Sequence, residues 1–167
     1  MNSRRDRFYA LLCTAGGFGL SPFAPGTIGT IPAVGVYLCI AWLAPPELRT
    51  ILIGVALLLS CLLCVALGSW AERHWRTADP GVFVLDEVAG FLVCVLLFQS
   101  STVLGTALWA FLASRAFDVI KPWPVYKMEE LPGGVGILLD DLLASLYAVI
   151  FLHAAAYFFP IFFAKLA

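Results

Sequence analysis

Long apolar stretches alternate with short polar junctions along this chain. The first two stretches predict helices at about residues 25–43 and 48–69. Each is long enough to cross the hydrocarbon core of a bilayer, which needs about 20 residues. Consecutive prolines, Pro45 and Pro46, are expected to separate the two helices, because each proline removes a backbone donor and disfavours a continuous helix.

The next apolar region, residues 88–117, is too long for one simple span. A polar Gln-Ser-Ser-Thr segment at residues 99–102 interrupts it. We therefore expect a hairpin of two short helices, at about 86–98 and 102–118. A final helix is expected at about 138–159, ending before Pro160.

Composition agrees with this pattern. Hydrophobic residues make up 62% of the chain and charged residues only 13%, and the mean hydropathy is +0.95. A soluble domain typically carries about twice that share of charge. We predict an all-α fold: a polytopic membrane helical bundle with about four to five membrane helices. Residues 1–167 are expected to form a single domain.

The charge of the chain argues against a nucleic-acid partner. The net charge is −1 at neutral pH. No run of Lys and Arg is long enough to follow a phosphate backbone. The expected surroundings are a lipid bilayer, and the oligomeric state is left open.

The positions of the basic residues predict the orientation in the membrane, since cytoplasmic junctions carry an excess of Lys and Arg. With the hairpin in place, only Arg49 and Lys165 fall on one side. We therefore expect a cytoplasmic N-terminus. The basic residues on the expected cytoplasmic side are Arg4, Arg5, Arg7, Arg73, Arg76, Arg115, Lys121 and Lys127.

Carboxylates gather at helix ends on the same expected face. Asp86 and Glu87 open one predicted helix, Asp118 closes the next, and Asp140 and Asp141 are expected in the first turn of the last. Helix capping could explain either pair alone, because the helix dipole favours anions there. Three acidic elements on one face instead favour a site for a hard cation such as Mg²⁺ or Mn²⁺.

Basic residues accompany these acids. Arg115, Asp118 and Lys121 recur at intervals of three, which places Arg115 and Asp118 on one helical face. The segment is compatible with an ion pair at the membrane surface. It is equally compatible with a cationic clamp on a phosphate group beside a metal-binding carboxylate.

Two glycine-rich segments precede predicted helices. Gly133 and Gly134 come shortly before the last acidic pair, and a segment from Gly16 to Gly29 contains Thr27 next to the start of the first span, with Thr30 one residue beyond. Such segments can present backbone N–H groups to an anion. An ordinary turn into a helix is the alternative explanation.

Taken together, four segments resemble the phosphatidylglycerophosphatase A family of bacterial membrane lipid phosphatases. They are GLSPFAPGTIGT at residues 19–30, VLDEVAG at 84–90, SRAFDVIKPWPV at 114–125 and GGVGILLDD at 133–141. The motifs occur in the family's order, and the resemblance extends over nearly the whole chain. One departure is Ala144-Ser145, where the family often has Ala-Gly.

The resemblance implies Mg²⁺-dependent hydrolysis of phosphatidylglycerophosphate to phosphatidylglycerol and inorganic phosphate, at the cytoplasmic face of the bacterial inner membrane. The alternatives are a small cation transporter and a non-catalytic membrane subunit. Phosphate binding is expected from Arg115, Lys121, Thr27, Thr30, Gly133 and Gly134. The implied catalytic residues are Arg115 and Lys121 with five metal-binding acids: Asp86, Glu87, Asp118, Asp140 and Asp141.

Overall fold

The computed structural model describes residues 4–131 and 133–163, which form six α-helices and three short 3₁₀ helices and contain no strand. The α-helices are α1 (Arg4–Cys13), α2 (Pro25–Leu43), α3 (Pro46–Trp75), α4 (Leu85–Leu97), α5 (Val103–Ile120) and α6 (Gly134–Phe158). The 3₁₀ helices are η1 (Phe18–Leu20), η2 (Val125–Glu130) and η3 (Pro160–Phe162).

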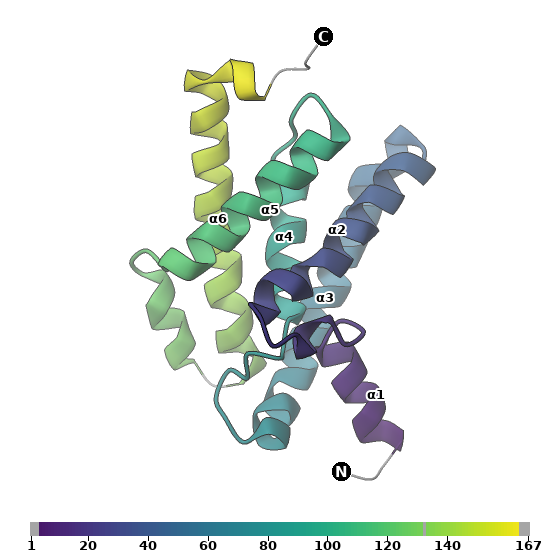
Figure 1. Cartoon of the computed structure of the whole chain (residues 1–167), viewed down its shortest axis with the longest axis vertical. Helices are drawn as coiled ribbons and strands as arrows, with labels where there is room; N and C mark the ends of the chain where they lie inside the picture. The colour runs from purple at the N-terminus through teal and green to yellow at the C-terminus, as the bar shows by residue number, and fades with distance from the viewer. Residues whose placement is uncertain (1–3, 132, 164–167) are drawn as a thin grey trace.

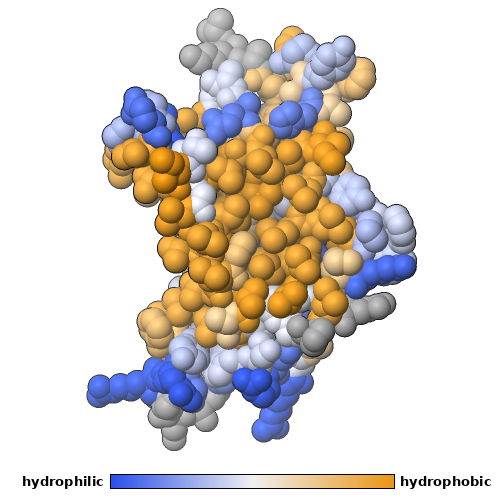
Figure 2. All heavy atoms as spheres, turned by 180° about the vertical axis from the view of Figure 1, so that it is seen from behind, coloured by the Kyte–Doolittle hydropathy of each residue, from blue (hydrophilic) through white to orange (hydrophobic). Residues whose placement is uncertain are grey.

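Four helices, α2, α3, α5 and α6, are long and apolar enough to cross a membrane. The α2–α3 and α4–α5 connections lie at the same end of the molecule as the last turns of α6, opposite α1 (Figure 1). A broad apolar band separates two polar ends on the face seen in Figure 2. The prediction of an all-helical membrane bundle is therefore confirmed.

The predicted hairpin is present as α4 and α5. Helix α4 has 13 residues and is about 20 Å long, too short to cross a bilayer alone. The Thr102 side chain caps α5 by accepting a hydrogen bond from the Gly105 amide at 3.0 Å. A polar segment thus starts a new helix here because its hydroxyls satisfy the free amides.

Helix α3 is longer than predicted and continues beyond Ser69 to Trp75. Its last turns are stabilised by aromatic packing that the polar composition of this segment does not reveal. Trp70 stacks on His74 at 4.3 Å between ring centroids, and Tyr9 of α1 meets Trp70 edge-on at 5.4 Å. These contacts keep a polar segment helical.

Helix α6 begins at Gly134, earlier than the predicted start near Leu138. Gly133 precedes it with a φ of 65°, a conformation that suits glycine. The expectation that Asp140 and Asp141 lie in the first turn of this helix is therefore wrong. They lie about two turns inside it, roughly 10 Å from its start.

Helix α4 occupies the centre of the bundle and contacts α2, α3, α5 and α6. Most of its apolar side chains are buried, with Phe91, Cys94 and Val95 at 0% exposure. Upstream, the Val84 amide donates a 2.9 Å hydrogen bond to the Cys13 carbonyl at the end of α1. These contacts fix the first turn of α4, which carries Asp86 and Glu87, inside the bundle.

Close glycine contacts set the distance between α3 and α6. A Cβ at Gly68 would overlap the backbone of Gly134, and a Cβ at Gly134 would overlap the Cys64 carbonyl. Small residues at such crossings let helix backbones approach in a membrane. These contacts therefore fix the position of α6 relative to α3.

We expect Gly134→Ala to lower the free energy of unfolding by about 1–3 kcal/mol, because the added methyl group overpacks the crossing. Denaturant titration in detergent micelles measures the change. Gly35→Ala on α2 is the matched control, since a Cβ there meets nothing within 4 Å. Equal unfolding midpoints for the two variants would contradict the tight crossing.

Candidate active site

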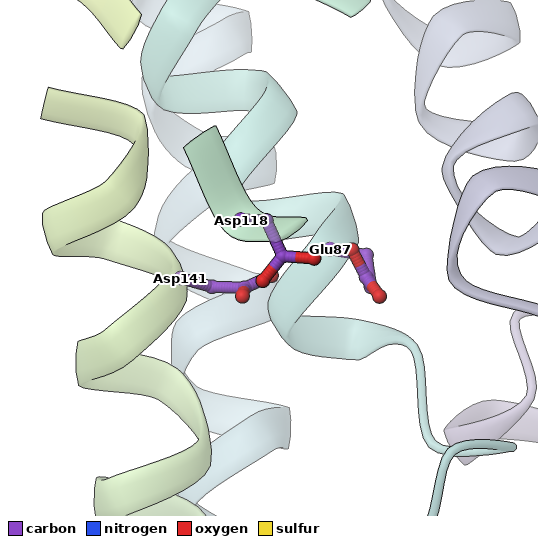
Figure 3. A group of neighbouring side chains, drawn as sticks. All are labelled: Glu87, Asp118 and Asp141. Atoms are coloured by element: carbon purple, nitrogen blue, oxygen red, sulfur yellow. The ribbon is translucent and has the colours of Figure 1, made fainter. Parts of the chain in front are cut away.

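Three of the predicted acids converge from three different helices. One carboxylate oxygen each from Glu87 on α4, Asp118 on α5 and Asp141 on α6 lies within 4.8 Å of the other two. Figure 3 shows Asp118 and Asp141 pointing toward each other across the first turns of α4, with Glu87 beside them. Residues far apart in sequence thus form one acidic cluster.

The remaining two predicted acids, Asp86 and Asp140, are buried, with 7% and 3% of their surface exposed. The Oδ1 atom of each is buried without a hydrogen-bond partner among the described residues. A buried carboxylate oxygen without a partner is costly, so such atoms usually face a cation or an ordered water. Both acids therefore offer free oxygen ligands.

Arg115 connects the acidic cluster to the N-terminal part of α2. Its guanidinium forms ion pairs with Glu87 and with Asp118, and its Nη1 lies 3.5 Å from the Thr30 hydroxyl. The Thr30 hydroxyl donates its own hydrogen to the Gly26 carbonyl at 2.8 Å. One side chain thereby links three helices: α2, α4 and α5.

The exposure of Arg115 distinguishes between the two interpretations of its sequence position. Only 11% of its side chain is exposed. A surface ion pair that reaches into the lipid headgroups would leave the guanidinium solvated. The buried position instead favours a positive charge held inside a site.

Lys121 also lies near the acids, but its position is set by the end of α5 and not by the helix itself. It follows the last residue of α5 with a φ of 43°, so the chain leaves the helix there. Its Nζ lies 2.9 Å from Asp140 Oδ2 on α6. Lys121 thus pairs with Asp140, and it does not simply continue the helical face of Arg115 and Asp118.

The first turn of α2 lies against the same cluster. Ala24 precedes it in a left-handed conformation, with a φ of 42°. A Cβ at Gly26 would overlap the Glu87 carboxylate, so the backbone passes very close to that side chain. The amides of Gly26 and Thr27 have no partner within an α-helix at these positions and are free to bind an anion.

Gly133 and Gly134, at the start of α6, were predicted to bind phosphate, but in the structure both pack closely against α3. Gly133 packs against the Ser69 side chain and Gly134 against the backbone of α3. Close packing therefore explains both glycines, and their phosphate-binding role stays a prediction. Capping no longer explains Asp140 and Asp141, because carboxylates two turns inside a helix are beyond its first free amides.

The departure at Ala144-Ser145 does not prevent close packing. Ser145 is buried, and a Cβ at Gly90 would lie 2.6 Å from its hydroxyl. The Cys94 thiol on α4 lies 3.6 Å from the Ser145 carbonyl. Helices α4 and α6 therefore meet closely one turn from Asp141.

Two further acids near the site were missed in the sequence. Glu72 and Asp79 line a small hollow of about 30 Å³ together with Asp140. The turn signal Asp79-Pro80-Gly81 lies just ahead of the acidic pair that opens α4, and it could have pointed to Asp79. Glu72 gave no comparable signal, because it belongs to a polar helix end.

Comparison with known proteins identifies the relatives of the chain. The family model described as Phosphatidylglycerophosphatase A matches residues 11–156. A protein of Haemophilus influenzae named "Phosphatidylglycerophosphatase A" is 35% identical over 148 residues, which cover 88% of each chain. A protein of the same name from Escherichia coli is 27% identical over 152 residues, covering 90% of this chain and 85% of that protein.

A further relative carries a different name. A Bacteroides thetaiotaomicron protein named "Putative phosphatidylinositol-3-phosphatase" is 34% identical over 157 residues, covering 91% of this chain and 96% of that protein. No solved structure matches the chain. The extent of the family match nevertheless gives a clear assignment: the chain belongs to the phosphatidylglycerophosphatase A family and is a phosphatase enzyme.

Proposed function

We propose that this protein hydrolyses the phosphate monoester of phosphatidylglycerophosphate, with Mg²⁺ as cofactor, and releases phosphatidylglycerol and inorganic phosphate in glycerophospholipid biosynthesis. The observation that carries this proposal is the cluster of Glu87, Asp118 and Asp141, whose carboxylate oxygens lie within 4.8 Å of one another next to the Arg115 guanidinium. The names of two relatives support this substrate. The family assignment favours an enzyme over a cation transporter or a non-catalytic subunit.

The donor set fits Mg²⁺. The cluster contains only carboxylate oxygens, the hard ligands that Mg²⁺ binds, and includes neither His nor Cys. Glu87, Asp118 and Asp141 would hold the ion, with the partnerless oxygens of Asp86 and Asp140 as further ligands. Bound Mg²⁺ would neutralise phosphate charge and acidify an attacking water.

The cationic side chains would bind the phosphate. The Arg115 guanidinium is already oriented by Glu87 and Asp118, so little freedom is lost when it binds phosphate oxygens. Lys121 and the free amides of Gly26 and Thr27 would contribute further donors. A carboxylate left free by the metal would accept the proton of the attacking water.

The active site is expected to face the cytoplasm at the bacterial inner membrane, because the junctions on the side of α1 carry most of the basic residues. In a variant without the five native cysteines, Thr77→Cys and Lys127→Cys should resist an impermeant thiol reagent added to intact cells. Glu47→Cys, in the first turn of α3 beside the α2–α3 connection, should react. Labelling of position 77 or 127 from outside would contradict this orientation.

The central test is phosphate release by the purified protein from phosphatidylglycerophosphate, with and without Mg²⁺. We expect Asp141→Asn to lower activity by about 100-fold or more, because a neutral amide is a poor ligand for a hard cation. Glu47→Gln, an exposed acid far from the cluster, is the control and should retain activity. Mg²⁺ affinity, measured by calorimetry, should fall in Asp141→Asn alone.

Phosphatidylinositol 3-phosphate should be assayed in parallel, because one relative is named for that lipid. Faster turnover of this lipid would overturn the proposed headgroup. Full activity in the chelator EDTA, or unchanged activity of Asp141→Asn, would overturn the metal-dependent mechanism.

Arg115→Lys tests the phosphate clamp. A lysine keeps the charge beside Glu87 and Asp118 but cannot form the planar, two-pronged contact of a guanidinium. We expect kcat to fall by about 100-fold while Mg²⁺ affinity is nearly unchanged. Arg49→Lys is the control, since Arg49 lies far along the chain from the cluster and donates to the Ala44 carbonyl in the α2–α3 connection. Unchanged turnover in Arg115→Lys would leave Lys121 as the cationic candidate.

A further inference from the structure

Helices α2 and α5 contact each other, with α5 crossing in front of α4 (Figure 1), and their seam has two chemically different parts. Toward the acidic cluster, Arg115 on α5 contacts Thr30 on α2. Farther along the seam lies an apolar hollow of about 270 Å³. Six of its lining residues are Ile31, Val34, Leu38, Leu104, Leu108 and Phe111.

The hollow lies next to the site along both helices. Ile31 follows Thr30 in sequence, and Phe111 lies one helical turn before Arg115. From Arg115 to Leu104 at the far end of the hollow, α5 rises about 16 Å. The same pair of helices therefore carries the Arg115 guanidinium at one end of the seam and the apolar hollow at the other.

The hollow is open on its outer side. Ile31, Leu104 and Leu108 are exposed on the surface of two membrane-spanning helices, where they would meet lipid. Ala107 forms a buried floor, since its exposure is 5%. A small residue between two large, exposed ones gives the groove its depth.

We propose that this α2–α5 groove binds one acyl chain of the phospholipid substrate while the phosphate lies at Arg115. The inference rests on the proposed function and adds the place of the lipid chain. In a bilayer the phosphate of a lipid lies at the surface and the chains point toward the centre. The seam has the same order, with charge at the end near the acidic cluster and hydrocarbon farther into α2 and α5.

The groove acts by positioning rather than by hydrophobic transfer. A chain that moves from the bilayer into an apolar groove exchanges one hydrocarbon environment for another, so little transfer free energy is gained. Packing against Val34 and Phe111 instead restricts how the lipid can tilt. A fixed tilt holds the phosphate at Arg115, and small errors in such alignment lower rates strongly.

Val34→Trp tests the groove by filling it. In bilayer nanodiscs with dipalmitoyl phosphatidylglycerophosphate, we expect kcat/KM to fall by about tenfold. With dihexanoyl phosphatidylglycerophosphate, whose short chains do not reach the far end of the groove, kcat/KM should change less than twofold. Val55→Trp, at an exposed position of α3, is the matched control and should affect neither substrate.

An equal loss with both substrates, or no loss with either, would overturn the acyl-chain groove. A loss that accompanies a change from dimer to monomer on size exclusion would also overturn it, because a second copy of the chain would then be the occupant. No phosphate release by the wild-type protein at either chain length would instead count against the proposed function.

A binding experiment tests the groove without turnover. Phosphatidylglycerophosphate carrying a photoreactive diazirine halfway along one palmitoyl chain should crosslink to peptides from α2 and α5 in the wild-type protein. Val34→Trp should reduce these crosslinks at least threefold, and Val55→Trp should not. Crosslinks spread evenly over α3 and α6 would contradict the groove even in an active enzyme.

Discussion

The ion pairs of Arg115, whose side chain is only 11% exposed, are the interactions on which the site depends. Arg115 pairs with Glu87 on α4 and Asp118 on α5 and contacts Thr30 on α2. Carboxylates packed this closely repel one another in a low-dielectric interior. A positive charge between two of them offsets part of that repulsion. The same charge joins three helices whose apolar surfaces give little driving force for association in lipid.

Close packing between helices fixes the positions of the acids on α4 and α6. The short helix α4 is surrounded by protein, so Asp86 and Glu87 begin a helix inside the bundle. The close approach of Gly90 to Ser145 then sets the position of Asp141 beside them. The site is thus formed where small residues allow helices to approach and charged residues are left facing one another.

Much of this arrangement could be predicted from the sequence. Proline and polar junctions predicted the α4–α5 hairpin and both ends of α2, because these signals are local. The predicted start of α6 and the predicted end of α3 were wrong. The true start of α6 depends on the packing of Gly134 against α3, and the true end of α3 depends on the packing of Trp70 against Tyr9. The position of Asp79 beside the site was not predicted, because Asp79 comes near Asp140 only when the α3–α4 loop folds back.

Charge balance explains why a cation and a phosphate would belong to the same site. The acids at the cluster outnumber Arg115 and Lys121, so a phosphate dianion approaching the protein alone would meet net negative charge. A divalent cation among Glu87, Asp118 and Asp141 would reverse that local field. Under the proposed function, the acids therefore make phosphate binding conditional on metal binding. The cationic side chains select the orientation of the phosphate once the metal is present.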